Sequence, residues 1–344
     1  MPGLKVALIY AQPVKEYLIA HNLFDKRYAI RREAEAVVFP VTREFSPPFD
    51  FDVEFIDDDL DERQIAQSLR DAVWPLLTPE ERTRVRTAYD IVGSIAIIDI
   101  PQELEAKERL IGEKIMENNK TVTTVLKKAG AHQGVYRTQP MVCIAGEDVR
   151  ETMVVENGVR LKVNVEETYY SIRMSTERRR ITTLVKPDER ILCLFSGVGP
   201  YPVTLSKHTL AKDIVGVEIN PKGHELAVEN VAKNRCLNVR LFCGDAHDII
   251  LKLIETGDFF DRITMPLPHT ADEFLDDVMK VSRPGTVIHF YAFLEENAFN
   301  RHVVKLREIA QRHDFAIARY DVVKVGQHAP RVWRICVDAQ LTRL

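Results

Sequence analysis

The chain has 344 residues, of which 45% are hydrophobic and 28% charged, and its 47 Lys and Arg against 51 Asp and Glu give a formal net charge of −4. With only 15 Gly and 17 Pro, this composition excludes collagen-like and disordered proteins and indicates two or three globular domains. No run approaches the roughly 18 consecutive apolar residues of a membrane span, and the N-terminal stretch does not resemble a signal peptide. We therefore predict a cytoplasmic protein.

The cysteines argue against structural metal binding. There are five of them, they show no C-x-x-C spacing, and most lie in apolar runs typical of strands. We expect reduced, buried thiols and no metal site, because the histidines also lack ligand spacing. The residues concerned are Cys143, Cys193, Cys236, Cys243 and Cys336.

Residues 1–62 are predicted to form a small N-terminal domain with an acidic linker. Periodicity indicates a helix near residues 11–22 and a strand at 36–39 that ends at Pro40. Paired prolines at 47–48 and the acidic run DFDVEFIDDDLDE at 50–62 oppose a packed core, so this stretch is interpreted as the linker.

Residues 63–168 are predicted to form a middle α+β domain. Helices are expected at 78–87 and 101–119, and a β-rich run lies at 91–100. An antiparallel sheet with a turn at 156–158 would follow; its strands are expected at 121–126, 135–137, 152–155 and 160–165.

Charge is unevenly distributed over this domain. From Asn118 through Gly146 there is no Asp or Glu, whereas Lys127 and Lys128 occur there, and a second basic cluster includes Arg179. These residues indicate either a phosphate-binding surface or merely a solvated face.

Residues 169–344 alternate apolar strands with amphipathic helices, which predicts a doubly wound, mainly parallel α/β sheet of Rossmann-like type. In such sheets ligands bind beyond the carboxyl ends of the strands. The predicted strands are RILCLF (190–195), DIVGVEI (213–219), VRLFC (239–243), FDRITM (260–265), GTVIHFYAF (285–293) and a hairpin of 320–325 with 332–339.

The turn after the first of these strands favours a nucleoside ligand without a pyrophosphate. Gly197 and Gly199 allow close backbone approach, but Pro202 replaces the third glycine of the dinucleotide fingerprint. This speaks against the alternative of a nicotinamide-dependent oxidoreductase. Glu218 and Asp245 at the next two strand ends would attract a cationic sulfonium compound, which indicates S-adenosylmethionine. The alternative is that both carboxylates only cap strand ends.

Several segments resemble the archaeal and eukaryotic tRNA (guanine-37-N1)-methyltransferases, and the likeness covers nearly the whole chain. FSGVGPYPV, GVEINPKGHELAVENVAKN, CGDAHDI and MPLPHTADEFLD resemble their methyltransferase domain. Their tRNA-facing segments are resembled by GVYRTQPMVCIAGE and YYSIRMSTERRRI. These two segments are more specific to the family than the glycine turn is. YDIVGSIAII resembles their middle domain, and KEYLIAHNLFDKRYAIRREAEAVVFPV resembles the small N-terminal domain of archaeal members.

The resemblance implies a monomeric enzyme that methylates N1 of guanine 37 in tRNA. It implies Glu177 as the general base and Arg137 as the cation that stabilises charge at O6; the alternative for Glu177 is a surface ion pair, and for Arg137 a phosphate contact. Substrate-binding roles are expected for Arg173, Lys127, Lys128 and Arg179. The residues expected to bind the cofactor are Arg178, Phe195, Gly197, Val198, Gly199, Glu218, Ile219, Asp245, Ala246, Pro266, Leu267 and Pro268.

Two positions depart from the family's pattern. Cys193 stands where members commonly have Asp, and Pro266 replaces the Asn of an Asn-Leu-Pro run. Pro offers only a carbonyl where Asn offers both donors and an acceptor. Transfer of a methyl or aminocarboxypropyl group to the wyosine base therefore stays an alternative, as does a tRNA-binding protein without catalysis.

Overall fold

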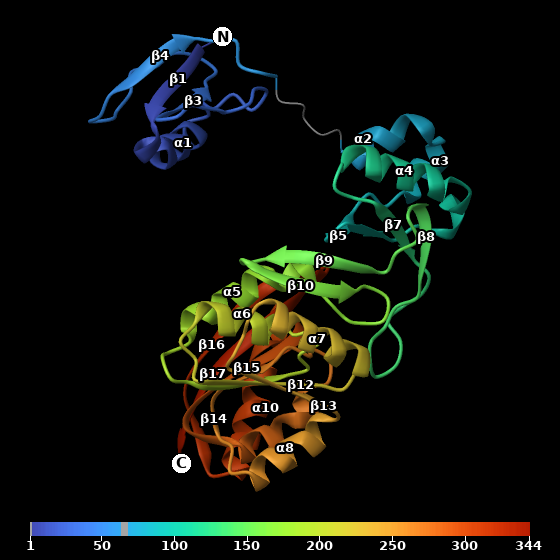
Figure 1. Cartoon of the computed structure of the whole chain (residues 1–344), viewed down its shortest axis with the longest axis vertical. Helices are drawn as coiled ribbons and strands as arrows, with labels where there is room; N and C mark the ends of the chain where they lie inside the picture. The colour runs from blue at the N-terminus through green and yellow to red at the C-terminus, as the bar shows by residue number, and fades with distance from the viewer. Residues whose placement is uncertain (1, 63–67) are drawn as a thin grey trace. The chain divides into compact units, whose positions relative to one another are not determined.

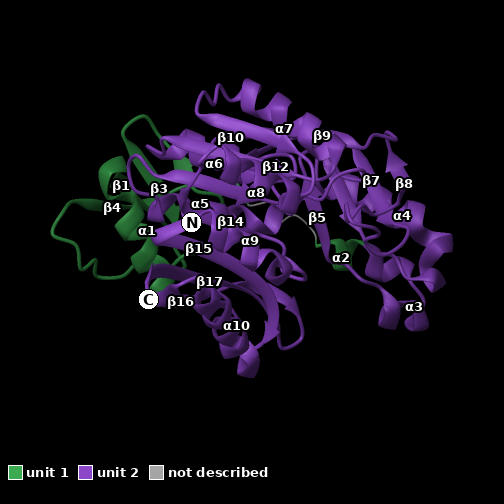
Figure 2. Ribbon diagram, turned by 90° about the horizontal axis from the view of Figure 1, so that it is seen from below, with its two compact units in different colours: residues 1–72 green, residues 73–344 purple. Residues whose placement is uncertain are grey.

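The computed structural model describes residues 2–62 and 68–344, which divide into two compact units, 1–72 and 73–344 (Figure 2). Each unit is described by itself. Within the described residues, no helix is long and apolar enough to cross a membrane.

Unit 1 is an antiparallel sheet in the order β2-β3-β1-β4, with one helix packed on it (Figure 1). Leu4 and Val6 of β1 alternate toward the core, where they meet Val14 and Leu18 of α1. Its elements are β1 (Pro2–Ala7), η1 (Leu8–Tyr10), α1 (Ala11–Ala20), β2 (Arg31–Arg32), β3 (Ala36–Pro40) and β4 (Val53–Asp57), followed by α2 (Leu69–Val73) near the boundary.

The prediction that residues 46–62 form a linker was wrong for residues 53–57, which form a strand. Residues 53–57 form β4, which pairs with β1. The acidic residues alternate with aromatic ones, so one face of the segment is apolar: Phe51 stacks on Tyr10 with ring centroids 4.0 Å apart, and Phe55 contacts Phe45 edge-on. Alternation with period two produces a half-buried strand even when every second residue is charged.

The first part of unit 2 contains a four-stranded sheet in the order β5-β6-β7-β8. The prediction of one antiparallel sheet from 121 to 165 was wrong, because β7 belongs to this sheet and β9 and β10 form a separate one. In this sheet β7 pairs in parallel with β6, since the helical crossover between them returns the chain to the same end. The elements are η2 (Trp74–Leu76), α3 (Pro79–Arg84), β5 (Tyr89–Val92), β6 (Ile95–Ile98), η3 (Gln102–Lys107), α4 (Glu108–Asn118), β7 (Thr124–Lys128) and β8 (Met141–Gly146).

Residues 135–137, predicted as a strand, lie in a turn. Gly134 and Arg137 both have positive φ angles, of 63° and 53°, which strand geometry does not allow. The turn belongs to the loop between β7 and β8. Arg137 is therefore carried by a loop rather than fixed in a sheet.

A separate hairpin follows, made of β9 (Glu151–Glu156) and β10 (Val159–Asn164). Its turn falls at the predicted place, with positive φ at Asn157 and Gly158. The side chain of Asn230 accepts from the N–H of Lys162 and donates to its carbonyl, which docks β10 onto helix α7 (Pro221–Lys233).

The C-terminal part is a seven-stranded sheet in the order β13-β12-β11-β14-β15-β17-β16. The first five strands are parallel and the last two antiparallel, which confirms the predicted doubly wound sheet and its closing hairpin. The strands are β11 (Arg190–Leu194), β12 (Asp213–Glu218), β13 (Val239–Cys243), β14 (Phe260–Met265), β15 (Ser282–Glu295), β16 (Phe315–Ala329) and β17 (Val332–Arg343).

Helices cover both faces of this sheet (Figure 1). Leu192, Val215 and Ile263 are fully buried in the sheet, and α7 is one of the amphipathic helices expected between its strands. The remaining elements are η4 (Ile172–Met174), α5 (Ser175–Leu184), α6 (Pro200–His208), α8 (Ala246–Glu255), η5 (Ala271–Phe274), α9 (Leu275–Lys280), η6 (Glu296–Ala298) and α10 (Phe299–Arg312).

Candidate active site

The turn between β11 and α6 has the backbone of a ligand-binding loop. Phe195, Gly197 and Gly199 have φ angles of 54°, 55° and 83°. A Cβ at Gly199 would lie 3.3 Å from the Cβ of Ala227. Glycine at this position therefore allows both the positive φ angle and the close packing against α7. The loop thereby stays close to the sheet edge and leaves the space beyond β11 open.

Glu218 holds this loop from the end of β12. Its carboxylate accepts hydrogen bonds from the N–H of Gly197 at 2.6 Å and of Asn220 at 2.8 Å. Asn220, rather than Glu218, caps α7. Burial raises the pKa of the Glu218 carboxyl, while the backbone donors oppose this effect.

Asp245 follows β13 and caps α8, because its carboxylate accepts from the N–H of His247 at 2.9 Å. Asp245 thus has the structural capping role that was the alternative to cofactor binding, at least for the one carboxylate oxygen that accepts this bond. The carboxyl ends of β11, β12 and β13 carry Phe195, Glu218 and Asp245 in order, as the parallel register requires.

A cavity opens beyond the carboxyl ends of β11 and β14. Two buried polar atoms of residues that line it, the hydroxyl of Ser196 and Nε of Arg334, have no hydrogen-bond partner among the described residues. Native proteins rarely leave such atoms unpaired. The residues lining this cavity are Tyr169, Tyr170, Ser171, Met174, Arg178, Phe195, Ser196, Gly197, Pro200, Tyr201, Pro266, Pro268, Tyr291 and Arg334.

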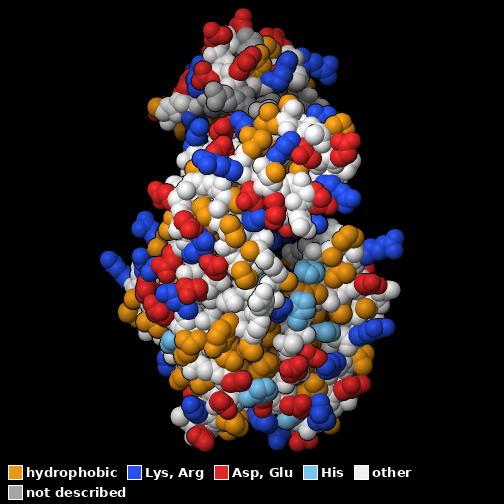
Figure 3. Space-filling view, turned by 90° about the vertical axis from the view of Figure 1, so that its right-hand side faces the viewer, with side chains coloured by type: hydrophobic (Ala, Val, Ile, Leu, Met, Phe, Trp, Pro, Cys, Tyr) orange, Lys and Arg blue, Asp and Glu red, His pale blue; other side chains and the backbone are white. Residues whose placement is uncertain are grey.

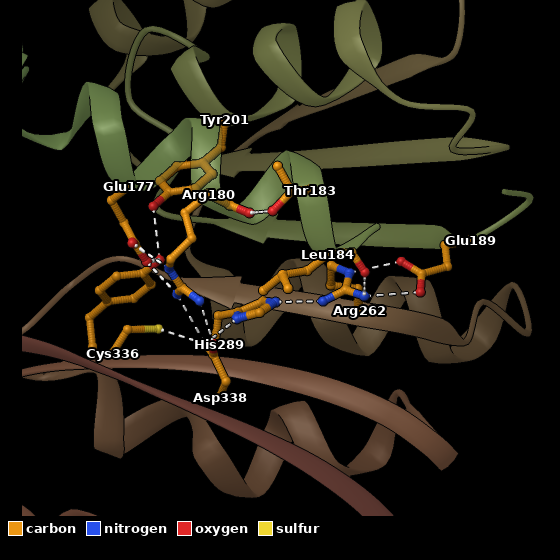
Figure 4. Close-up of polar contacts among 11 residues, drawn as sticks. Glu177, Arg180, Thr183, Leu184, Glu189, Tyr201, Arg262, His289, Cys336 and Asp338 are labelled. Carbon is orange, nitrogen blue, oxygen red and sulfur yellow. Dashed lines mark hydrogen bonds and ion pairs between the residues drawn. The ribbon is translucent and has the colours of Figure 1, made fainter. Parts of the chain in front are cut away.

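Glu177 lies directly behind this cavity, on α5, and is 5% exposed. Its carboxylate accepts two hydrogen bonds of 2.7 Å from Arg180 and one of 2.6 Å from the hydroxyl of Tyr291 (Figure 4). The hydroxyls of Tyr201 and Tyr291 are 2.9 Å apart. Tyr291 lines the cavity, so this side chain connects the cavity wall to Glu177.

Arg180 joins Glu177 to a buried polar network. It also bonds Asp338, which accepts from Nδ1 of His289 at 2.5 Å. Nε2 of His289 accepts from Arg262, which pairs with Glu189 (Figure 4). His289 is therefore the neutral tautomer protonated at Nδ1, and acids alternate with arginines along the network.

The network includes the one group of metal-ligand type found in the described residues, His289, Cys336 and Asp338. Two guanidinium groups, those of Arg180 and Arg262, already contact Asp338 and His289. Burial raises the pKa of the Cys336 thiol well above its ordinary value, so it stays protonated. A metal cation would have to displace both arginines, and we assign none.

Comparisons with known proteins give the family. The chain is 33% identical to tRNA (guanine(37)-N(1))-methyltransferase Trm5b of Pyrococcus abyssi, over 99% of each chain. It belongs to the archaeal and eukaryotic tRNA (guanine-37-N1)-methyltransferase family. The predicted resemblance is confirmed.

Family domains cover three segments of the chain. Residues 3–50 match the tRNA methyltransferase 5 N-terminal domain, 69–149 the TYW2 N-terminal domain, and 152–318 the TRM5/TYW2 methyltransferase domain. The crystal structure of the Pyrococcus abyssi protein superimposes with a TM-score of 0.73 over 99% of both chains. The structure titled the complex of aTrm5 and tRNALeu gives 0.68 at 25% identity, also over 99% of both chains.

The arginines of the family's S-x-R and E-R-x-R segments are held by acids in this structure. Arg178 is buried and makes two 2.5 Å bonds to Glu156, while it lines the cavity. Arg173 is largely exposed and binds both carboxylate oxygens of Asp90 at 2.9 Å. Arg178 is thus fixed beside the cavity, whereas Arg173 faces solvent on one side.

The loop that carries Arg137 contacts the cavity wall through His132. The ring of His132 meets that of Tyr169 edge-on, with 5.5 Å between centroids, and its Nδ1–H donates to the carbonyl of Arg137 at 2.8 Å. Arg137 also acts on His269, whose pKa is lowered first by burial and then by this positive charge. Arg137 is not among the residues lining the cavity.

The predicted basic surface is only partly available. Lys127 bonds Glu105 and Glu108, both from the helical segment that packs across β7, and hydrogen bonding to Glu108 raises its pKa. The absence of acids from 118–146 therefore does not leave Lys127 unpaired. Lys128 is half-buried and Arg179 is exposed.

The departures from the family's pattern have different consequences. Cys193 lies inside β11, pairs with Gly216 and Thr264, and is fully buried; burial raises its pKa to about 12. It is a core residue and does not reach the cavity. Pro266 and Pro268 line the cavity, and the intervening Leu267 packs against the main core.

Of the cysteines predicted as buried, Cys243 is exposed.

Sequence reasoning missed Tyr291 and Arg334. Both lie on strands of the closing part of the sheet, far along the chain from the glycine turn, and both line the cavity. The only feature of the sequence that could have indicated them is that each is a side chain with polar atoms within a mainly apolar strand. Of the other tyrosines that line the cavity, Tyr169 is exposed, whereas Tyr170 bonds Glu156 and Tyr201 is buried.

Proposed function

We propose that this protein is an S-adenosylmethionine-dependent methyltransferase that acts on N1 of guanine 37 in tRNA, next to the anticodon. The observation that carries the proposal is the full-length match, 33% identical over 99% of the chain, to a protein of that name. The cavity at the sheet edge, with Glu177 behind it, supplies a site of suitable chemistry.

The cofactor site fits S-adenosylmethionine. Glu218 keeps free lone pairs for two ribose hydroxyls, Asp245 lies at the adjacent strand end, and Ser196 offers an unsatisfied hydroxyl. Bound there, S-adenosylmethionine supplies an electrophilic methyl group on a sulfonium. Val198, Ile219, Ala246 and Leu267 belong to the same strand ends and would line the adenosine part.

The reaction requires removal of the proton on guanine N1. Glu177 is the proposed base, and Tyr291 would connect it to the substrate, because Tyr291 lines the cavity and its hydroxyl donates to the carboxylate at 2.6 Å. The N1 proton passes to the Tyr291 oxygen as the Tyr291 proton passes to Glu177. The deprotonated N1 would then be ready to accept the methyl group, whose bond to the sulfonium would break with its electron pair left on sulfur.

Charge left on the base spreads to O6, where Arg137 is the proposed stabilising cation. Its loop would have to carry it toward the cavity once RNA is bound. Binding of tRNA would use Arg173, Arg179 and Lys128 as phosphate contacts, with the target base turned out of the anticodon loop. We expect a monomer acting in the cytoplasm, where tRNA is its substrate.

The domain boundaries at residues 62 and 168 stay part of this proposal. Residues 1–62 would bind a distant part of the tRNA, 63–168 would contact the RNA near the target, and 169–344 would carry out methyl transfer. Residues 63–67, which contain the first boundary, lie outside the described residues.

Single-turnover methylation of tRNA by Glu177→Gln and Tyr291→Phe tests the proposal. We expect both variants to be slowed by roughly 10²–10⁴-fold at saturating cofactor and tRNA, with little change in either affinity. Tyr201→Phe, which leaves the Tyr291–Glu177 hydrogen bond in place, should be affected less. Wild-type rates in Glu177→Gln would remove it as the base, and nucleoside analysis without 1-methylguanosine would overturn the function.

A second candidate function is transfer to the wyosine base. A Methanocaldococcus jannaschii protein named tRNA(Phe) (4-demethylwyosine(37)-C(7)) aminocarboxypropyltransferase is 26% identical and matches 74% of this chain. Pro266, in place of the usual Asn, is the residue that favours it. Mass analysis of the modified nucleoside distinguishes the two reactions.

A further inference from the structure

A group of rings lies beside the cavity, on the protruding ends of the last three strands. Phe293 of β15 and His328 of β16 stack with centroids 3.8 Å apart and ring planes 25° from parallel. His269, from the loop after β14, contacts Phe293 at 4.9 Å. Three separate segments therefore meet in one aromatic cluster.

Arg334 joins this cluster to the cavity. It stands directly opposite Phe293 in the β15–β17 pairing, and its guanidinium lies 5.0 Å from the Phe293 ring centre. It also lines the cavity that would hold the target base. Its Nε is buried and has no hydrogen-bond partner among the described residues, which is costly unless a ligand supplies an acceptor.

The cluster is open to a ligand. His269 and His328 are exposed and Phe293 is half-buried. Gly326 pairs with Arg334 across the hairpin, and a Cβ placed on it would meet no heavy atom within 4 Å. Figure 3 shows histidine side chains gathered along a hollow of one face of the molecule. The outer face of the His328 ring can therefore continue the stack with a further planar group.

The charge state suits a planar ring as ligand. Burial lowers the pKa of His328, and Arg334 lowers it further. Burial also lowers the pKa of His269, aided by Arg137, His328 and Arg334. Both imidazoles are therefore neutral at neutral pH, and the positive charge that faces the cluster comes from Arg137 and Arg334. Neutral rings beside a guanidinium are the chemistry with which proteins hold unpaired nucleotides.

We propose that Phe293, His328, His269 and Arg334 form a stacking site for the nucleotide adjacent to the target base, with Arg334 binding its phosphate or base edge. This inference rests on the proposed function. Because Arg334 borders both the cavity and the rings, a nucleotide stacked on them is the immediate neighbour of the one in the cavity. Stacking recognises any base, so the site would add affinity and hold the loop open without reading sequence.

The test measures binding of the full-length protein to anticodon stem-loop RNAs that are intact or lack the base on the 5′ or the 3′ side of the target. We expect His328→Ala to weaken binding of intact RNA about tenfold, as for loss of one stacked base, and His328→Phe to restore it. On the RNA that lacks the correct neighbouring base, wild type and His328→Ala should bind equally. At saturating RNA, the single-turnover rate of His328→Ala should stay within about twofold of wild type.

Tyr320→Ala is the matched control, because Tyr320 is an exposed ring on the same strand at its other end. It should bind every RNA as wild type does. The proposal is overturned if His328→Ala binds intact RNA normally, or if it weakens binding to all three RNAs equally. If the coupling between His328 and a neighbouring base is found but no 1-methylguanosine forms, the stacking site stands and the proposed function fails.

Discussion

Glu177 shows how one residue can satisfy a structural and a chemical requirement together. A buried carboxylate is costly unless charge and hydrogen bonds compensate it, and Arg180 with Tyr291 supplies both. The same contacts fix one carboxylate oxygen on the tyrosine that faces the cavity. If Glu177 is the base, as proposed, it is positioned before substrate arrives and needs no further ordering at the moment of proton transfer.

The proposed role of Glu218 in cofactor binding can be tested by a single substitution. Glu218→Ala should weaken S-adenosylmethionine binding by about 1–3 kcal/mol, because the carboxylate would lose its bonds to the ribose and the loop would lose its anchor at Gly197. Isothermal calorimetry with the cofactor alone measures this. Glu225→Ala, on the exposed side of α7, is the control. Equal affinity of wild type and Glu218→Ala would exclude Glu218 from the cofactor site.

At the scale of elements, α7 connects the hairpin to the cofactor loop through Asn230. Its fully buried amide bonds the backbone of Lys162 in β10 and donates to the carbonyl of Val198 at 2.9 Å. Asn234, one turn later, bonds both backbone groups of Arg160. Helix α7 therefore pairs with the open edge of β10 much as another strand would, and protects that edge.

Asn230→Ala should destabilise unit 2 by about 2 kcal/mol or more, since three buried backbone groups lose their partners. Because Val198 belongs to the glycine loop, cofactor affinity should fall as well. Chemical denaturation and calorimetry measure the two effects. Val228→Ala, on the exposed face of the same helix, should change neither. A stable Asn230→Ala variant with normal cofactor affinity would show that the hairpin is held by other contacts.

The elements that sequence predicted well are those with strong local periodicity. The strands from 190 to 265 and helix α7 fell where alternation of apolar runs and amphipathic stretches placed them. Residues 53–57 were missed because charge density was weighed above the alternating aromatic residues. The parallel pairing of β6 with β7 was missed because pairing direction depends on which edge a crossover reaches, which local pattern does not specify.

The site was predictable where it consists of strand ends, and not where it consists of long-range side-chain pairs. Gly197, Glu218 and Asp245 follow from the order of parallel strands. The contact of Arg180 with Asp338 joins residues 158 positions apart, and no local spacing in the sequence predicts such a pair. The acidic partners of Lys127 likewise lie outside the acid-free segment 118–146, so the composition of that segment does not reveal them.

For the whole molecule, the buried network predicts a stability that decreases toward acid. Burial lowers the pKa of His289 despite the opposing bond to Asp338, so the unfolded chain binds a proton on this group at a higher pH than the folded one does. Burial raises the pKa of Asp338, but its bonds to His289 and Arg180 outweigh this and lower it well below the ordinary range. Below about pH 6.5, the unfolded state therefore holds more protons and stability rises with pH.

We expect the melting temperature of the full chain to fall steadily as the pH is lowered from 7 to 5. His289→Gln should be less stable at pH 7, because it disturbs contacts to Arg262 and Asp338, but should lose less stability on acidification than wild type. Thermal unfolding followed by circular dichroism at several pH values measures both slopes. Identical slopes would show that His289 does not carry the pH dependence.

The division into two units yields the last prediction. Unit 1 has its own core around Leu4, Val14, Leu18 and Phe39, and the cavity is lined by residues of unit 2 alone. A chain lacking residues 1–62 should therefore bind S-adenosylmethionine normally. If unit 1 binds a distant part of the tRNA, it acts by raising the effective concentration of the catalytic unit at its target.

A contact between residues 1–62 and a distant part of the tRNA predicts a loss of affinity that depends on the RNA used. On intact tRNA, the shortened chain should have an affinity lower by about tenfold or more, whereas on an isolated anticodon stem-loop both chains should bind and react alike. Filter binding and single-turnover methylation on the two RNAs provide the comparison, with cofactor affinity as the check that unit 2 is intact. Equal affinity of both chains for intact tRNA would show that residues 1–62 make no contact with it, and an equal loss on both RNAs would place their contact at the anticodon itself.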